Sequence, residues 1–147
     1  MSRTIVVTVL IALATLPALS SKSDQSAKDE SVYAPLTRAP KKAQARTNPL
    51  AKDPDAVAAG AKLYEQHCAE CHGDIAQGGK KAPSLLADEV QQATPGTLFW
   101  ILTNGVVRRG MPVWSKLPEP QRWQLVSYIQ SLNPIRTPTS AAPAAQP

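Results

Sequence analysis

Two cysteines and a histidine stand together in the segment Cys68-Ala69-Glu70-Cys71-His72, and these are the only cysteines among the 147 residues. The spacing C-x-x-C-H is typical of a c-type haem attachment site. On a helical turn, the two thiols can each add to one vinyl group of a porphyrin, and the adjacent imidazole then lies beneath the iron as its proximal ligand. The pattern therefore predicts one haem c, attached through Cys68 and Cys71, with His72 as a metal ligand.

The same cysteine pair has other known uses. A thioredoxin-like redox site is expected near alternating strands and helices, and a structural zinc site needs two further ligands, usually from a second Cys or His pair. The sequence has neither, since the only other histidine is His67. A secreted binding module without haem, closed by a Cys68–Cys71 disulfide, stays an alternative that colourless purified protein would support.

Iron bound by His72 has a second axial position, for which Met111 is the candidate. Met111 is the only methionine apart from the initiator, and it lies in the Gly/Pro segment Arg108-Arg109-Gly110-Met111-Pro112. A methionine on a helix usually fills space in a core, whereas a rigid loop can present its thioether to a metal. His67 is excluded as the distal ligand, because it adjoins Cys68 on the proximal side. We therefore expect His72 and Met111 to be the axial ligands.

The attachment motif is predicted to lie on the first of three helices. Asp53-Pro54 begins this helix, because an acidic N-cap is followed by proline at the first helical position. Helical spacing then puts four residues on one face: Val57, Ala61, Tyr64 and Cys68. The motif is therefore predicted at the C-terminal end of the helix, on its buried face.

Two further helices follow the motif. Thr94-Pro95-Gly96 begins one of them and Asn104-Gly105 ends it. The last helix begins near Pro118–Pro120 and ends at Asn133-Pro134. No alternating strand pattern occurs after the N-terminal segment, so the predicted fold class is all-α.

Composition divides the chain into four segments. Residues 1–20 have one positive charge, a short apolar run and small residues at the end, which predicts a secretory signal peptide and a periplasmic protein; an uncleaved membrane anchor is the alternative. Residues 21–52 are polar and basic, and we expect a flexible arm. Residues 53–133 are predicted to form the folded domain, and residues 134–147 a disordered tail rich in proline and alanine.

Charge and size narrow the function further. The net charge of +5 belongs to the arm, because residues 53–132 carry about as many acidic as basic side chains. This balance, together with export, disfavours nucleic acid as a partner, although the basic arm can contact an anionic membrane surface. A domain of about 80 residues with a single phenylalanine has a thin core, so we expect haem to be part of that core.

On these residues the chain resembles class I bacterial cytochromes c, which hold one haem between histidine and methionine. The resemblance covers about 80 residues and rests on the attachment motif together with Gly60, Tyr64, Gly73, Pro83, Leu85, Gly110-Met111-Pro112, Trp123, Leu125 and Tyr128. It implies a small cytochrome c fold in which the first helix crosses the last, with Gly60 and Tyr64 against Leu125 and Tyr128.

The resemblance also implies roles around the haem. The carbonyl of Pro83 would accept a hydrogen bond from the proximal imidazole, which makes the imidazole a better donor to iron. Trp100, Arg108 and Arg109 would reach the haem propionates, although core packing is an equal alternative for Trp100.

With both axial positions filled, iron offers no vacancy for a substrate, so we predict one-electron exchange and no catalytic site. The predicted protein is a monomeric periplasmic carrier of the respiratory chain. It would move electrons between a dehydrogenase or quinol-oxidising complex and a terminal acceptor, with Lys80, Lys81, Arg108 and Arg109 steering an acidic partner. Two alternatives stay open: a haem enzyme or gas sensor with a displaceable Met111, and a cytochrome subunit docked permanently on a dehydrogenase.

Overall fold

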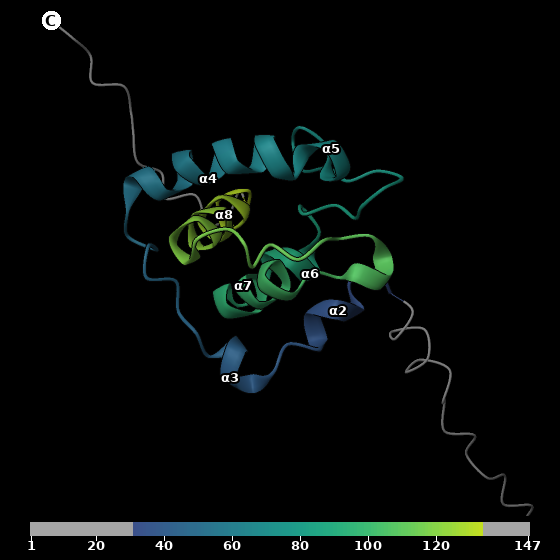
Figure 1. Ribbon diagram of the computed structural model, residues 1–147, viewed down its shortest axis with the longest axis horizontal. Helices are drawn as coiled ribbons and strands as arrows, with labels where there is room; N and C mark the ends of the chain where they lie inside the picture. The colour runs from purple at the N-terminus through teal and green to yellow at the C-terminus, as the bar shows by residue number, and fades with distance from the viewer. Residues whose placement is uncertain (1–30, 134–147) are drawn as a thin grey trace, which may run out of the picture.

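The computed structural model describes residues 31–133, and all regular elements in this part are helices (Figure 1). In chain order they are α2 (Ala34–Thr37), α3 (Lys41–Gln44), α4 (Pro54–His67), α5 (Ala69–His72), α6 (Asp88–Gln91), α7 (Pro95–Asn104), the 3-10 helix η1 (Val107–Arg109) and α8 (Glu119–Ser131). The all-α prediction is confirmed. None of these helices is long and apolar enough to cross a membrane. The predicted signal peptide and C-terminal tail lie outside the described residues.

The three long helices begin where the sequence predicts, and α7 also ends at its predicted stop. The side chain of Asp53 accepts a hydrogen bond of 2.9 Å from the backbone N–H of Asp55 at the start of α4. Thr94 caps α7 in the same way, and Gly105 ends it with a φ of 65°, which favours glycine. α8 follows Pro118 directly. Local chemistry therefore sets these boundaries.

α4 and α8 cross closely, and α8 in turn packs on α7, so that α8 lies between them (Figure 1). At the crossing, a Cβ on Gly60 would overlap the carbonyl of Gln124 and approach the Cβ of Tyr128 to 2.9 Å. The rings of Tyr64 and Tyr128 lie 5.1 Å apart. The helix crossing that the resemblance implied is therefore present, and it depends on the absence of a side chain at Gly60.

The first helix differs from its prediction in two respects. Val57 is 37% exposed, whereas its neighbour Ala56 is buried with Gly60 and Tyr64, so the buried face is displaced by one residue at its start. The helix also ends at His67, and the attachment motif lies on the separate short helix α5. The helix is interrupted at Cys68, whose φ of −124° and ψ of −34° depart from helical geometry.

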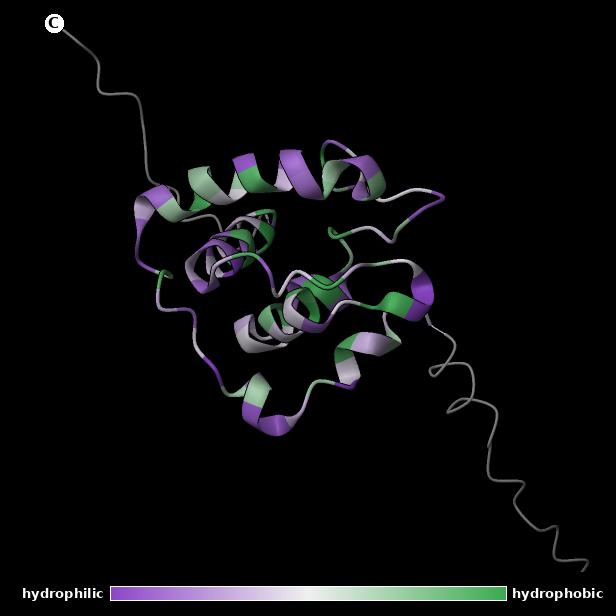
Figure 2. Cartoon of the chain, in the orientation of Figure 1, coloured by the Kyte–Doolittle hydropathy of each residue, from purple (hydrophilic) through white to green (hydrophobic). Residues whose placement is uncertain are grey.

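Buried apolar residues of α4, α7 and α8 form one hydrophobic core. Figure 2 colours the ribbon by hydropathy and shows hydrophobic residues on all three helices. The largest fully buried side chains are Trp123, Tyr64, Leu125 and Val126. Phe99 of α7 stacks on Trp123 of α8 with ring centroids 4.1 Å apart. The single phenylalanine thus occupies the centre of the α7–α8 contact.

The prediction of a flexible arm is wrong for residues 31–52, which fold against α7 through α2 and α3. A Cβ on Gly96 would overlap the carbonyl of Ala43, so α3 and α7 touch through their backbones. The hydroxyl of Thr94 donates a hydrogen bond of 2.9 Å to the carbonyl of Gln44. Low hydrophobicity predicts that a segment cannot fold alone, but it does not prevent docking on a surface that is already formed.

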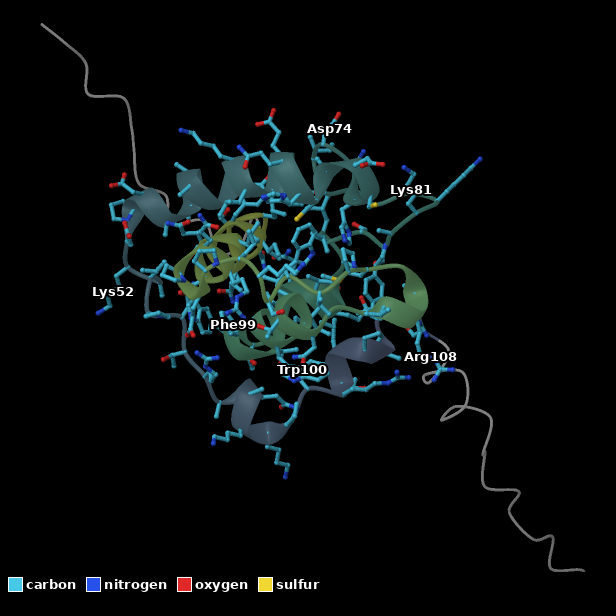
Figure 3. All side chains as sticks on the ribbon, viewed as in Figure 1. Lys52, Asp74, Lys81, Phe99, Trp100 and Arg108 are labelled. Carbon is cyan, nitrogen blue, oxygen red and sulfur yellow. The ribbon has the colours of Figure 1, made fainter. Side chains whose placement is uncertain are left out.

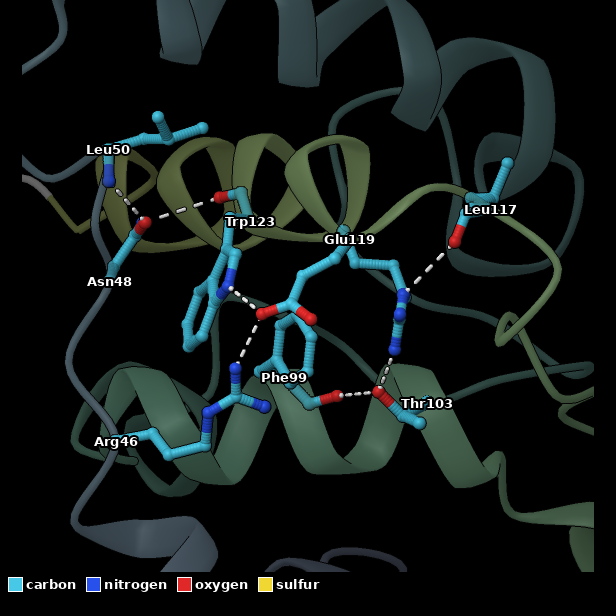
Figure 4. Close-up of polar contacts among 9 residues, drawn as sticks. Arg46, Asn48, Leu50, Phe99, Thr103, Leu117, Glu119 and Trp123 are labelled. Carbon is cyan, nitrogen blue, oxygen red and sulfur yellow. Dashed lines mark hydrogen bonds and ion pairs between the residues drawn. The ribbon is translucent and has the colours of Figure 1, made fainter.

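Two polar residues fasten the end of this segment (Figure 4). Asn48 is buried, and its amide donates hydrogen bonds of 2.8 Å to the Ser127 hydroxyl and 3.3 Å to the Trp123 carbonyl. Arg46 forms an ion pair of 2.6 Å with Glu119, and its guanidinium lies 4.4 Å from the centroid of the Phe99 ring. These contacts tie the segment to both α7 and α8.

Candidate cofactor site

A cavity of about 610 Å³ opens beside the attachment motif, which is within the range of about 300–1,000 Å³ for cofactor sites. Its walls come from α5 and the loop after it, from α6 and α7, from the η1 loop, and from residues 32–36. Most of the inner wall is aliphatic, from Leu85, Val90, Leu98, Ile101, Leu102, Val106 and Ile129. An apolar wall of this kind suits the faces of a porphyrin.

The predicted attachment and ligand residues all border this one cavity: Cys68, Cys71, His72 and Met111. The thiols of Cys68 and Cys71 are not bridged to each other. Burial, with a smaller contribution from the Cys71 thiol, raises the pKa of Cys68 to about 11, so this thiol is neutral at pH 7. Cys71 is exposed at the edge of the site.

The imidazole of His72 is held in one orientation by the backbone. Its Nδ1 lies 2.8 Å from the carbonyl oxygen of Pro83. Because a carbonyl can only accept, Nδ1 carries the proton and Nε2 keeps a lone pair for a metal. The contact that the resemblance implied for Pro83 is therefore present. The hydroxyl of Tyr64 also donates a 2.6 Å hydrogen bond to the carbonyl of Gly73, next to His72.

A tight backbone turn presents Met111. The N–H of Val106 donates to the carbonyl of Met111 at 3.0 Å, and the N–H of Met111 donates back at 3.3 Å. Gly110 closes the turn with a φ of 89°, a left-handed conformation that favours glycine. Met111 is half-buried and contacts the hydrophobic core from the cavity wall. Its backbone is thus fixed without a helix, as the loop prediction required.

Two candidate propionate contacts lie elsewhere. Neither Trp100 nor Arg108 borders the cavity; both side chains are labelled in Figure 3. Trp100 is two positions from Leu98 and from Leu102, both of which line the cavity, so it faces the opposite side of α7. Arg108 is exposed on the outer side of η1. Arg109, by contrast, does border the cavity.

Sequence reasoning missed two contributors to the cavity wall. Trp114 lines it, donates its backbone N–H to the Leu102 carbonyl at 2.9 Å, and places its ring 5.2 Å from that of His67. Its position three residues after Met111, in the same Pro-containing loop, was an available signal. The other contributor is the segment of residues 32–36, which includes Tyr33. Its polar composition predicted a flexible arm, so nothing in the sequence indicated that it lines the cavity.

The residues present fit haem c. Two thiols at the edge, an oriented imidazole, a loop methionine and aliphatic walls are the groups that a covalently attached, axially ligated haem needs. Within residues 31–133, no three His, Cys, Asp or Glu side chains gather as a separate metal site.

The chain is similar in sequence to known cytochromes and cytochrome subunits. Residues 55–129 match the family described as cytochrome C oxidase, cbb3-type, subunit III. The chain is 39% identical over 95 residues to the cbb3-type cytochrome c oxidase subunit CcoP of Azospirillum sp. (strain B510), covering 58% of this chain and 31% of that protein. It is 34% identical over 89 residues to cytochrome c550 of Pseudomonas aeruginosa, covering 58% and 61% respectively.

Two further similarities extend the range of relatives. Quinohemoprotein alcohol dehydrogenase ADH-IIG of Pseudomonas putida is 37% identical over 75 residues, which are 50% of this chain and 10% of that protein. The crystal structure of cytochrome CL from Methylophaga aminisulfidivorans superposes with a TM-score of 0.52 at 25% identity, over 59% of each chain. The chain spans less than two thirds of the length of each of the three curated relatives.

The family match covers just over half of the chain and contains the attachment motif, the helix crossing and every cavity wall except the one from residues 32–36, which lie outside it. Members of this family take part in electron transfer through covalently bound haem c, either as carriers or as parts of an oxidase or dehydrogenase. The chain belongs to the cytochrome c family, with a small all-α domain of the kind found in subunit III of cbb3-type oxidases.

Proposed function

We propose that this chain carries single electrons through one haem c attached to Cys68 and Cys71, with His72 and Met111 as axial ligands. The observation that supports this most strongly is the convergence of these four residues on one apolar cavity. When bound, the haem supplies reversible one-electron exchange.

The protein's own residues set the conditions for that exchange. The Pro83 carbonyl fixes the tautomer of His72 and leaves Nε2 with the lone pair that would bind the iron. The thioether of Met111 would bind the iron, so a small molecule would have to displace this side chain to bind there. A thioether favours the ferrous state more than a second imidazole does, so the reduction potential should exceed that of a bis-histidine site.

We propose a periplasmic location and a redox protein as partner. Two arrangements are possible: a monomeric shuttle between a dehydrogenase or quinol-oxidising complex and a terminal acceptor, or a subunit that stays docked. The similarity to CcoP and to ADH-IIG supports the second arrangement, since in those proteins the matching part is a fraction of a larger chain. The similarity to cytochrome c550 supports the first.

Positive side chains near the cavity support docking of an acidic partner. Lys80, Lys81 and Arg109 border the cavity, and Arg108 is exposed beside it. Lys81 pairs with Glu70 at 2.9 Å, which reduces its contribution to the surface potential. Replacing Lys80 and Arg108 with glutamate should therefore slow electron transfer to the partner at low salt. High salt should remove most of the difference, because the Debye length falls below about 10 Å above 0.1 M; equal rates at low salt would contradict electrostatic steering.

The experiment for the function itself is expression with the haem-maturation machinery, followed by absorbance spectroscopy and redox titration. We expect covalently bound haem, one per chain, and a ferric spectrum that changes in Met111→Ala, with a lower potential and cyanide binding. Colourless protein would favour the disulfide-closed module. Rapid carbon monoxide binding by the unmodified ferrous protein would favour the gas sensor or haem enzyme.

A further inference from the structure

One wall of the cavity comes from a segment that the family match does not include. Val32, Tyr33, Pro35 and Leu36 line the cavity, whereas the match begins at residue 55. Pro35 is buried, as is its neighbour Ala34, which is 5% exposed. An apolar wall from outside the family match therefore completes a site whose other walls belong to the matched domain.

This segment is fastened to both sides of the cavity. The hydroxyl of Tyr33 donates a hydrogen bond of 3.1 Å to the carbonyl of Ser84, the residue after Pro83. The guanidinium of Arg109 donates one of 2.9 Å to the carbonyl of Ser31, and Arg109 lies two residues before Met111. The segment thus joins the wall that orients the proximal imidazole to the wall that presents the methionine.

The residues that follow the segment contact α7 and α8. After α2, Ala39 is 4% exposed, α3 touches α7 through Gly96, and Asn48 is hydrogen-bonded to α8. Partial burial, with a smaller contribution from Glu89, raises the pKa of Tyr33, so its hydroxyl stays protonated and can donate at neutral pH. Residues 31–36 are therefore docked as part of the site.

We propose that residues 31–36 form a strap that closes one side of the haem cavity, and that Tyr33 is the positioning residue that holds it shut. This inference rests on the proposed function, since the strap can shield haem only if haem occupies the cavity. By excluding water the strap disfavours the more highly charged ferric state and so raises the reduction potential. By tying the Pro83 wall to the Met111 wall it also hinders displacement of the methionine by small ligands.

The test compares Tyr33→Phe, Tyr33→Ala and Thr37→Val in the full chain with haem attached. Thr37 is the matched control, because its hydroxyl bonds only within α2, to the Ala34 carbonyl at 2.8 Å, and it does not border the cavity. Loss of one hydrogen bond should make strap opening about two- to tenfold more frequent in Tyr33→Phe. Tyr33→Ala, which also removes the ring, should open it further.

Three measurements report the opening: the rate of cyanide binding to the ferric protein, the reduction potential, and tryptic cleavage after Arg38 and Lys41. We expect cyanide binding and cleavage to become faster in the order wild type, Tyr33→Phe, Tyr33→Ala, and the potential to fall in the same order. Thr37→Val should match the wild type in all three. If Tyr33→Ala fails to fold, Tyr33→Phe and Arg109→Gln test the two fastenings separately.

The outcomes separate the strap from the proposed function. Protein that never acquires haem but keeps its native helicity would overturn the function, and tryptic cleavage of the same variants would still test whether Tyr33 holds the segment in place. Normal haem content with unchanged cyanide rate, potential and cleavage in both Tyr33 variants would overturn the strap. Faster cleavage with unchanged cyanide rate and potential would also overturn it, because the segment would then open without exposing the haem.

Discussion

The family domain and the N-terminal segment are both folded, but different forces hold them. The domain is packed through large buried side chains, with Trp123, Tyr64 and Leu125 at the centre of α4, α7 and α8. Residues 31–52 bury mainly alanine and proline and depend on hydrogen bonds and cation–π contacts from Tyr33, Arg46 and Asn48. The domain provides a surface that the segment alone could not make, so the segment's folding depends on the domain.

The most severe test of this dependence is removal of the haem by the double substitution Cys68→Ala and Cys71→Ala. Without haem, the aliphatic walls of a cavity of about 610 Å³ would lose their largest apolar partner, at a cost of about 25 cal/mol for each Å² of apolar surface left in water, in a domain whose whole stability is typically about 5–15 kcal/mol. We expect loss of the cooperative transition in both regions by far-UV circular dichroism. A variant that keeps native helicity and melts cooperatively would show that the protein core suffices.

Within the domain, Gly60→Ala should be the most damaging single substitution. The new Cβ would overlap the Gln124 carbonyl, and backbone cannot move aside as a flexible side chain can. Overpacking of this kind costs about 3 kcal/mol. Lys62→Ala, at an exposed position of the same helix, is the control. Denaturant unfolding of the two holoproteins measures the difference; similar midpoints would contradict the close crossing.

The contact between segment and domain is tested by Asn48→Ala. The substitution removes hydrogen bonds to the Ser127 hydroxyl and the Trp123 carbonyl and leaves buried groups unsatisfied, which costs about 1–3 kcal/mol. We expect hydrogen exchange to accelerate across residues 31–52 while α4 and α8 keep their protection. Lys42→Ala, on the exposed side of α3, is the control. Equal acceleration in α4 would mean that the two regions unfold as one unit.

The smallest expected effect concerns acid stability. Hydrogen bonds from Trp123 and Arg46 lower the pKa of Glu119 below its ordinary value of 4.5. A lowered folded-state pKa contributes stability above pH 4.5, and that contribution disappears as the pH falls through the lowered value. Glu119→Gln should therefore be less stable than the wild type at pH 6, with the gap closing in acid. Glu65→Gln, at an exposed position of α4, is the control. A stability difference between Glu119→Gln and the wild type that persists unchanged in acid would contradict the lowered pKa of Glu119.

Local sequence was enough to place the starts of the three long helices and much of the site. Asp53, Thr94 and Gly105 act through hydrogen bonds and φ values within a few residues, so their effect can be read without tertiary structure. The attachment motif and the isolated Met111 are informative because their chemistry is rare. The contact of His72 with Pro83 was also predictable, although only through the resemblance.

The remaining features depend on contacts between distant segments. Trp100 and Trp114 are both candidates by type, and only the rotation of α7 and the path of the η1 loop decide that Trp114 lines the cavity. The docking of residues 31–52 required knowledge of the α7–α8 surface that receives Asn48 and Arg46. Composition indicates whether a segment can fold alone. It does not indicate whether the segment can dock on another part of the protein.

The crossing of α4 and α8 also determines when the site can close during folding. Gly60 precedes its contact Gln124 by 64 residues, nearly the whole length of the domain. Closing so long a loop costs conformational entropy before the contact stabilises the fold, so such pairings form late. Until α8 has docked on α4, the two thiols that follow α4 are not enclosed by the rest of the domain. We therefore expect both thiols to be accessible for haem attachment before the pocket has formed.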